Sequence, residues 1–112
     1  MEPEAPVLVV PDAVSAAAMA ELLRVLGHPL RLRIVVSLCI RSSMSVKALA
    51  ERLGVPQSMV SHQLRFLRLV EVVESVRQRG ESQYSLIRPC VRGVLGCLLA
   101  EQQESPRQEA RP

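Results

Sequence analysis

Residues 46–65 read VKALAERLGVPQSMVSHQLR, and this stretch decides the fold that the sequence predicts. Apolar residues recur at helical spacing up to Leu53, and Gly54 then follows, as glycine often does just past the end of a helix. Pro56 is typical of the first turn of a new helix, where its missing N–H costs nothing. That second helix has an apolar stripe at positions i, i+4 and i+7, which are Val60, Leu64 and Leu67. The stretch therefore predicts two short helices joined by a tight turn, a helix-turn-helix.

The face of the second helix opposite this stripe is polar and basic. Short hydroxyl side chains let a backbone come close to DNA, and Gln and Arg form bidentate hydrogen bonds with base edges. We therefore expect this helix to enter the DNA major groove. The expected base-reading residues are Ser58, Ser61, His62 and Arg65, with Gln57 assisting. On this stretch alone, a helical hairpin with a solvated polar face is the alternative.

The charge of the chain is concentrated in its centre. Residues 24–88 contain eleven Lys or Arg and four Asp or Glu, a net charge of +7, whereas the remaining residues carry a net charge of −4. A basic centre between acidic ends is typical of a small nucleic-acid binder. An arginine-rich composition that reflects a GC-rich genome is the alternative explanation.

The overall composition predicts one aliphatic, largely helical domain. The chain has 112 residues, of which 48% are hydrophobic, with one Phe, one Tyr and no Trp. So few aromatic residues argue against a base-stacking platform for single strands. Three irregularly spaced cysteines favour a reducing compartment over a disulfide framework. The start lacks the basic region of a signal peptide, and no apolar run approaches the ~18 residues of a membrane span, so we expect a cytoplasmic protein without a membrane partner.

Helices are also expected on both sides of the central motif. Asp12 is a plausible cap for a helix over residues 13–26, and His28 for a buried central helix that begins at Pro29. The last helix is expected from Pro89 to about residue 103. The first and last helices have more apolar surface than so small a core needs, which predicts a homodimer through these two helices. Residues 1–11 and 105–112 are expected to be flexible tails around a domain of residues 12–104.

After the second helix of the motif, the periodicity changes to that of strands. Residues 72–77 and 82–87 read as two strands, and Gly80 lies in the turn between them at a position that tolerates positive φ. A hairpin after a recognition helix is the wing of a winged helix-turn-helix, so the predicted class is mainly α with a small β-hairpin, in the order α-α-α-α-β-β-α. The residues expected to contact phosphate are Lys47, Arg68, Arg77 and Arg79. A hairpin whose arginines are merely solvated is the alternative.

Residues from about 22 to 100 resemble the ArsR/SmtB-type bacterial winged-helix repressors. The resemblance rests on short motifs that stand in the family's order: LGHP at 26–29 followed by Arg31 and Ile34, LA at 49–50 with LGV at 53–55, VSHQL at 60–64 with Leu67, and Gly80 with Tyr84 and Leu86. It implies a homodimer that binds a palindromic operator in double-stranded DNA and is released by a ligand. Pro56 departs from the family, which often has Ser there, so we expect the entry to the recognition helix to be held differently.

The family's metal sites are altered in this chain. Its thiolate site needs a Cys-x-Cys motif, and the matching residues 44–48 read MSVKA, so that site is expected to be absent. Its zinc or nickel site on the last helix uses an Asp-x-His pair and a His-x-x-Glu pair, and only Glu104 keeps its identity here. A rearranged nickel or zinc site of Cys90, Glu101 and Glu104 is one open alternative.

A redox sensor is a second alternative, because some relatives place cysteines on the second and last helices, where Cys39 and Cys97 lie with a shift. An unpaired Cys on an apolar face is otherwise a small core residue, and a regulator without an inducer is equally open. A winged-helix protein-interaction module, or a regulator that acts through a partner protein, is the rival function. We do not expect an enzyme, because the sequence shows no arrangement typical of a nucleophile with its base, and no glycine-rich phosphate loop.

Overall fold

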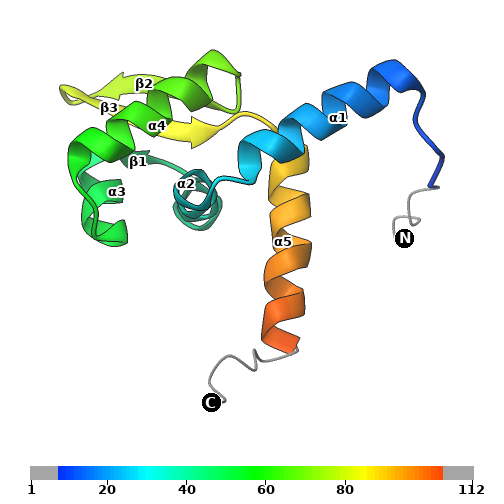
Figure 1. Cartoon of the computed structure of the whole chain (residues 1–112). Coiled ribbons are helices and arrows are strands. Elements are labelled where there is room, and N and C mark those ends of the chain that lie inside the picture. The colour runs from blue at the N-terminus through cyan, green and yellow to red at the C-terminus, as the bar shows by residue number, and fades with distance from the viewer. Residues whose placement is uncertain (1–7, 105–112) are drawn as a thin grey trace, which may run out of the picture.

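A computed structural model of the chain describes residues 8–104, which form five helices and three short strands (Figure 1). The elements follow in the order α1 (Ala13–Leu26), α2 (Pro29–Arg41), β1 (Met44–Ser45), α3 (Val46–Leu53), α4 (Gln57–Leu69), β2 (Val73–Gln78), β3 (Glu81–Leu86) and α5 (Pro89–Glu104). This order confirms the predicted winged helix-turn-helix. Residues 8–12 have no regular structure; the rest of the expected N-terminal tail, 1–7, and the whole expected C-terminal tail, 105–112, lie outside the described residues.

Helix α2 is the centre of the structure, as predicted. Ile34, Val35 and Leu38 are completely buried, and α2 contacts α1, α3, α4, α5 and β3. Figure 1 shows α2 end-on, with the other helices around it. The helix begins at Pro29, and the His28 side chain caps it, because His28 Nδ1 accepts a hydrogen bond from the Arg31 N–H at 3.3 Å. Together, the burial and the cap explain why the β-branched residues 34–36, which have a preference for strands, are helical here.

The helix-turn-helix is formed by α3 and α4. Ser45 Oγ accepts from the Ala48 N–H at 3.1 Å and caps α3, and Gly54 ends α3 in the left-handed conformation, with φ 69°. The prediction for Pro56 was wrong by one position. Pro56 is not in the first turn of α4 but precedes it as the N-cap residue, since its ψ of 146° is extended. Proline has no side-chain acceptor, so α4 begins without a side-chain cap.

The sheet has a third strand that the sequence did not reveal. β1 pairs antiparallel with β3, so the strand order is β1-β3-β2. Tyr84 of the central strand β3 pairs with Met44 of β1 on one side and with Ser75 of β2 on the other. The two longer strands begin and end within one residue of the predicted bounds. β1 is two residues long and continues directly into α3. A strand so short has no alternating pattern that a sequence could display.

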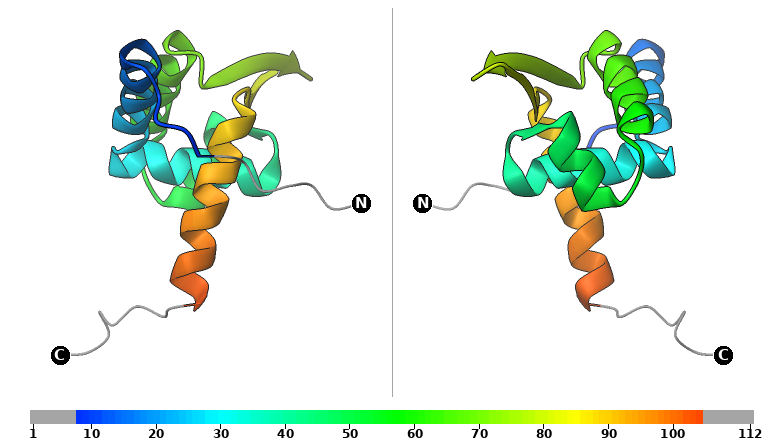
Figure 2. Two further views of the ribbon diagram at one scale, coloured as in Figure 1. Left: turned by 90° about the vertical axis from the view of Figure 1, so that its right-hand side faces the viewer. Right: turned by 90° about the vertical axis from the view of Figure 1, so that its left-hand side faces the viewer.

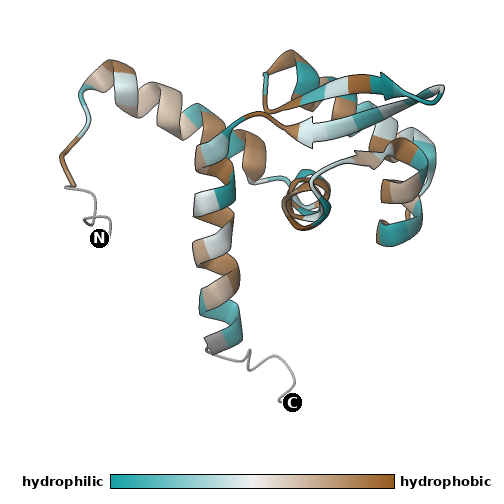
Figure 3. Cartoon of the chain, turned by 180° about the vertical axis from the view of Figure 1, so that it is seen from behind, coloured by the Kyte–Doolittle hydropathy of each residue, from teal (hydrophilic) through white to brown (hydrophobic). Residues whose placement is uncertain are grey.

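The outer helices α1 and α5 are buried only in part. In α1, Val25 and Leu26 join the core, whereas Val14 is 81% exposed; in α5, Val91 and Leu95 are buried, whereas Leu98 is 54% exposed. Figure 3 shows apolar residues along both helices, which extend away from the sheet and from α3. Among residues 8–104, no helix combines the length and the apolar content that a membrane span needs.

We expect Leu38→Ala to lower the free energy of unfolding by about 2–5 kcal/mol, because it removes a completely buried side chain and leaves a cavity in the core. Urea titration followed by circular dichroism measures this change. The matched control is Leu69→Ala, at a leucine that is 77% exposed, which should change the value by less than about 0.5 kcal/mol. Equal effects of the two substitutions would contradict the central role of α2.

Candidate nucleic-acid interface

Helix α4 turns its polar side outward because its apolar side is completely buried. Val60, Leu64 and Leu67 have no exposed surface, so their burial decides which side of α4 faces outward. The predicted base-reading and phosphate-contacting residues of α4 lie as follows: Gln57, Ser58, His62, Arg65 and Arg68 are exposed, and Ser61 is half-buried. The helix has no acidic residue in its first turn, so its uncapped N-terminus adds a partial positive charge to this face.

Lys47 of α3 lies beside the start of α4. Together with Gln57 of α4 and Glu81 of β3, its side chain lines a shallow hollow. This hollow joins three segments that are far apart in the sequence. The predicted phosphate contact Lys47 and the predicted base contact Gln57 therefore lie next to each other.

The wing, formed by β2 and β3, carries the remaining predicted residues. Arg77 and Arg79 are both exposed, and Arg79 lines a hollow with Gln78, Glu81 and Gln83 at the tip. Figure 2, in its right-hand view, shows α3, α4 and the wing reaching the same side of the molecule. Glu81 lines both the hollow that contains Gln57 and the hollow that contains Arg79, so the tip of the wing lies near the start of α4.

Two residues of this surface escaped the sequence analysis. Glu81 lines the hollow that contains Lys47 and also the hollow that contains Arg79, so its carboxylate would repel a phosphate group that approached either hollow. Leu69 lines a hollow with Arg65 and Arg68 and is 77% exposed, so it offers an apolar contact of the kind that thymine methyl groups accept. The signal for Leu69 was its position four residues after Arg65, on the same side of the helix.

Several arginines of the basic centre serve the fold. Arg24 donates hydrogen bonds to Glu21, Arg31 donates to Gln63 and to the Val25 carbonyl, and Arg33 donates to the Leu53 carbonyl. The positive charge counted in the sequence therefore overstates the charge of the α4 and wing surface.

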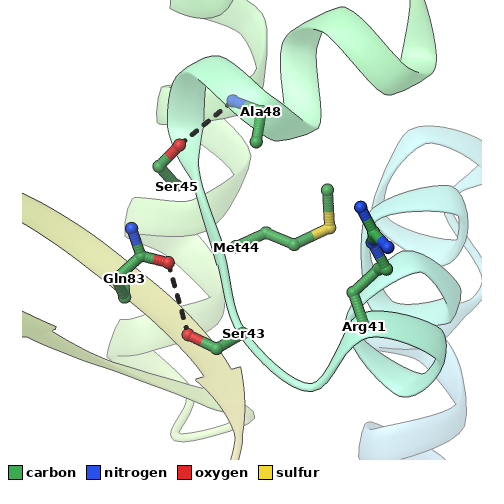
Figure 4. Close-up of a pocket in the computed structure, with 6 residues that line it drawn as sticks. All are labelled: Arg41, Ser43, Met44, Ser45, Ala48 and Gln83. Carbon is green, nitrogen blue, oxygen red and sulfur yellow. Dashed lines mark hydrogen bonds between the residues drawn. The ribbon is translucent and has the colours of Figure 1, made fainter.

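The segment that matches the family's thiolate site, residues 44–48, contributes Met44 to the core and exposes Lys47. Met44 is only 7% exposed. The pocket beside it is lined by side chains from α2, β1, α3 and β3: Arg41, Ser43, Met44, Ser45, Ala48 and Gln83 (Figure 4). Ser43 Oγ donates to Gln83 Oε1 at 3.4 Å across β1 and β3. No thiol or carboxylate lines this pocket.

The structure does not bring the candidate zinc or nickel ligands together within one chain. Cys90 and Glu101 lie eleven positions apart on α5, about 16 Å along the helix axis. The side chain of Glu104 is outside the part of the chain that the structure describes. Among the residues that are described, no group of three His, Cys, Asp or Glu side chains could hold a metal ion.

The cysteines proposed as a redox pair lie in different environments. Cys39 is half-buried on α2 and Cys97 is exposed on α5, and both are free thiols. Burial raises the pKa of the Cys39 thiol above its ordinary value, and the nearby Arg92 guanidinium opposes this shift only in part. In α5, Arg92 donates to the Cys39 carbonyl at 2.6 Å. A raised pKa reduces the thiolate that a redox sensor needs.

Comparison with known proteins identifies the family. Residues 28–75 match the family model described as "Bacterial regulatory protein, arsR family". The chain is 38% identical to the transcriptional repressor PagR of Bacillus anthracis over 79 residues, which cover 70% of this chain and 79% of PagR. It is 41% identical to the HTH-type transcriptional regulator NmtR of Mycobacterium tuberculosis over 75 residues, 67% of this chain and 62% of NmtR.

Solved structures agree with this assignment. The crystal structure of PagR superposes with a TM-score of 0.70 at 36% identity and covers 78% of this chain and 99% of that one. The solution structure of apo-NmtR gives a TM-score of 0.73 at 31% identity and covers 100% and 95%. The antimony-specific transcriptional repressor AntR gives 0.72 at 25% identity, covering 82% and 86%. The chain is therefore a member of the arsR family of bacterial regulatory proteins, a DNA-binding transcription regulator and not an enzyme.

Proposed function

We propose that this chain is a cytoplasmic, homodimeric repressor that binds a palindromic operator, with residues 12–104 as its single domain. The observation that carries the proposal is the exposed polar and basic face of α4, an element that reaches the same side of the molecule as the wing (Figure 2). PagR and AntR are both described as repressors, which supports repression as the outcome.

The roles of the residues follow from their chemistry and position. In α4, Ser58, His62 and Arg65 are exposed and would read base edges with Gln57, while the half-buried Ser61 would contribute only at close approach. The residues that would contact phosphate flank this face on α3, the end of α4 and the wing: Lys47, Arg68, Arg77 and Arg79.

The exposed apolar residues of α1 and α5 support a dimer. Val14, Met19 and Leu23 of α1 are each more than half exposed, and α5 adds Leu98 and Leu99. A soluble monomer rarely exposes so many large apolar side chains on two helices. A two-fold dimer through them would present two copies of α4 to half-sites about one helical turn of DNA apart.

Any control of this repressor by a ligand would act through residues of α2 and α5, the helices that carry the cysteines. AntR is described as antimony-specific, so the relatives of this chain include a repressor that is specific for a metalloid. A nickel or zinc site in this chain would need donors from two protomers, because Cys90 and Glu101 are too far apart on one helix. A Cys39–Cys97 sensor would have to work with a thiol whose pKa is raised.

Arg65→Ala and Arg79→Ala should separate base reading from phosphate contact. We expect Arg65→Ala to reduce the binding free energy for the operator by about 1–3 kcal/mol and to relax the sequence preference. Arg79→Ala should lower the affinity for every DNA sequence alike, and should reduce the slope of log affinity against log salt concentration by about one. The measurement is DNA affinity against salt concentration, on an operator selected from random duplexes and on a scrambled duplex. Equal losses on both duplexes for Arg65→Ala would refute its role, and selected sequences without an inverted repeat would refute the dimer.

Arg79→Asn should stabilise the fold while it weakens DNA binding. Arg79 and Gly80 form a two-residue turn with φ of 53° and 82°, and the left-handed region costs an ordinary residue roughly 1–2 kcal/mol but suits Asn. Thermal unfolding should therefore give a free energy of unfolding that rises by up to about 1 kcal/mol. A variant that is more stable and binds DNA as tightly as the natural chain would show that the Arg79 guanidinium does not contact phosphate.

Calorimetric titration of the reduced protein with Zn²⁺ or Ni²⁺ should give no micromolar binding, because the described residues of one chain do not form a metal site. The control is the double variant Glu101→Ala, Glu104→Ala. Micromolar binding that disappears in this variant would contradict the expectation and would reveal a site built across the dimer.

A further inference from the structure

A single arginine joins α1 and α4 from the first turn of α2. Arg31 Nε donates to Gln63 Oε1 at 3.0 Å, and its terminal Nη1 donates to the Val25 carbonyl at 3.3 Å. Its guanidinium carbon also lies 4.0 Å from the centre of the Phe66 ring, which is a cation–π contact. Gln63 and Phe66 are both in α4, one turn apart. The side chains of Arg31, Gln63 and Phe66 are half-buried, so solvent screens these interactions less than it screens contacts on the surface.

The α1 end of this contact satisfies a helix terminus. Val25 lies in the last turn of α1, where carbonyl groups have no partner within the helix. The positive charge of Arg31 also lies at the negative end of the α1 dipole. Arg31 is thus well placed to fix the C-terminal end of α1.

The contacts of Arg31 with α4 are directional, unlike the aliphatic contacts that hold the rest of this helix. α4 is held to the core by Val60, Leu64 and Leu67, and aliphatic contacts of this kind have little directional preference. Its N-terminus has no side-chain cap. The hydrogen bond to Gln63 and the contact with Phe66 are directional and lie one turn apart, so they oppose rotation of α4 about its axis. Gln63 and Phe66 each directly follow an exposed residue of the outer face, His62 and Arg65.

We infer that Arg31 is a positioning residue for operator recognition: it holds the outer face of α4 at a fixed angle to α1. The inference rests on the proposed function, because α1 is one of the two helices proposed to form the dimer. If α1 sets the position of the partner protomer and Arg31 sets α4 relative to α1, then Arg31 controls the spacing between the two recognition helices.

The test compares Arg31→Met with Arg33→Met, a matched control on the same helix. Arg33 is exposed and donates to the Leu53 carbonyl of α3, without a hydrogen bond to α4. Affinities are measured for the selected operator, for the same operator with one base pair inserted at its centre, and for a scrambled duplex. Thermal unfolding and sedimentation check that both variants fold and associate as the natural chain does.

We expect Arg31→Met to weaken operator binding about tenfold, because about 1.4 kcal/mol of the binding free energy would then be used to bring α4 to its binding angle. Binding to the scrambled duplex should change little, and the variant should discriminate less against the operator with the inserted base pair. Arg33→Met should leave two affinity ratios unchanged: that of the operator to the scrambled duplex, and that of the operator to the operator with the inserted base pair. Arg31→Lys should be intermediate, because an ammonium group keeps the charge over Phe66 but cannot reach Gln63 and Val25 together.

Equal weakening on all three duplexes would show that Arg31 acts only as a charge and would overturn the inference. Unchanged ratios for Arg31→Met would overturn it as well, with the proposed function intact. If Arg31→Met does not fold, Gln63→Leu removes the hydrogen bond from the other side and should reproduce the loss of discrimination. Failure of the natural chain to enrich any sequence from random duplexes would instead reject the proposed function, and the inference with it.

Discussion

The burial of one aliphatic helix is the constraint on which the whole structure depends. α2 contributes Ile34, Val35 and Leu38 to the centre of the core and contacts the other helices and β3. The described core contains no Trp and only half-buried aromatic rings, so its packing is almost entirely aliphatic. Such contacts favour closeness but specify angles poorly.

Arginines complement this packing at the ends of the helices. Arg31 donates to a carbonyl in the last turn of α1, Arg33 to one at the end of α3, and Arg92 to one near the end of α2. Each bond runs between two different helices and satisfies a carbonyl that its own helix leaves without a partner. Three arginines thus bridge the ends of neighbouring helices, whereas Arg65, Arg68, Arg77 and Arg79 stay exposed on α4 and the wing.

The parts of the structure that follow from local signals could be predicted from the sequence. Asp12, Gly27 and Pro29 set the bounds of α1 and the start of α2, and the turn at Gly80 set the hairpin, because caps and turns depend on neighbours along the chain. The pairing of Met44 with Tyr84, forty residues later, left no local trace. The same is true of the site: periodicity gave the outer face of α4, whereas the contacts of Arg31 with Val25, Gln63 and Phe66 depend on how three helices meet. Periodicity also grouped the apolar residues of α1, and their surplus over what the core needs agrees with the exposure of Val14, Met19 and Leu23 in the single chain.

The two-residue strand β1 has a consequence for the mechanics of regulation. Ser45 is at once the last residue of β1, paired with Gln83 of the wing, and the N-cap of α3. No linker separates the sheet from the helix-turn-helix at this point, so the chain offers no hinge between them. Each protomer would then bind DNA as one rigid unit. A signal that releases DNA would have to change the orientation of one protomer relative to the other. Changes in operator preference during evolution would likewise have to come from new side chains on an unchanged frame.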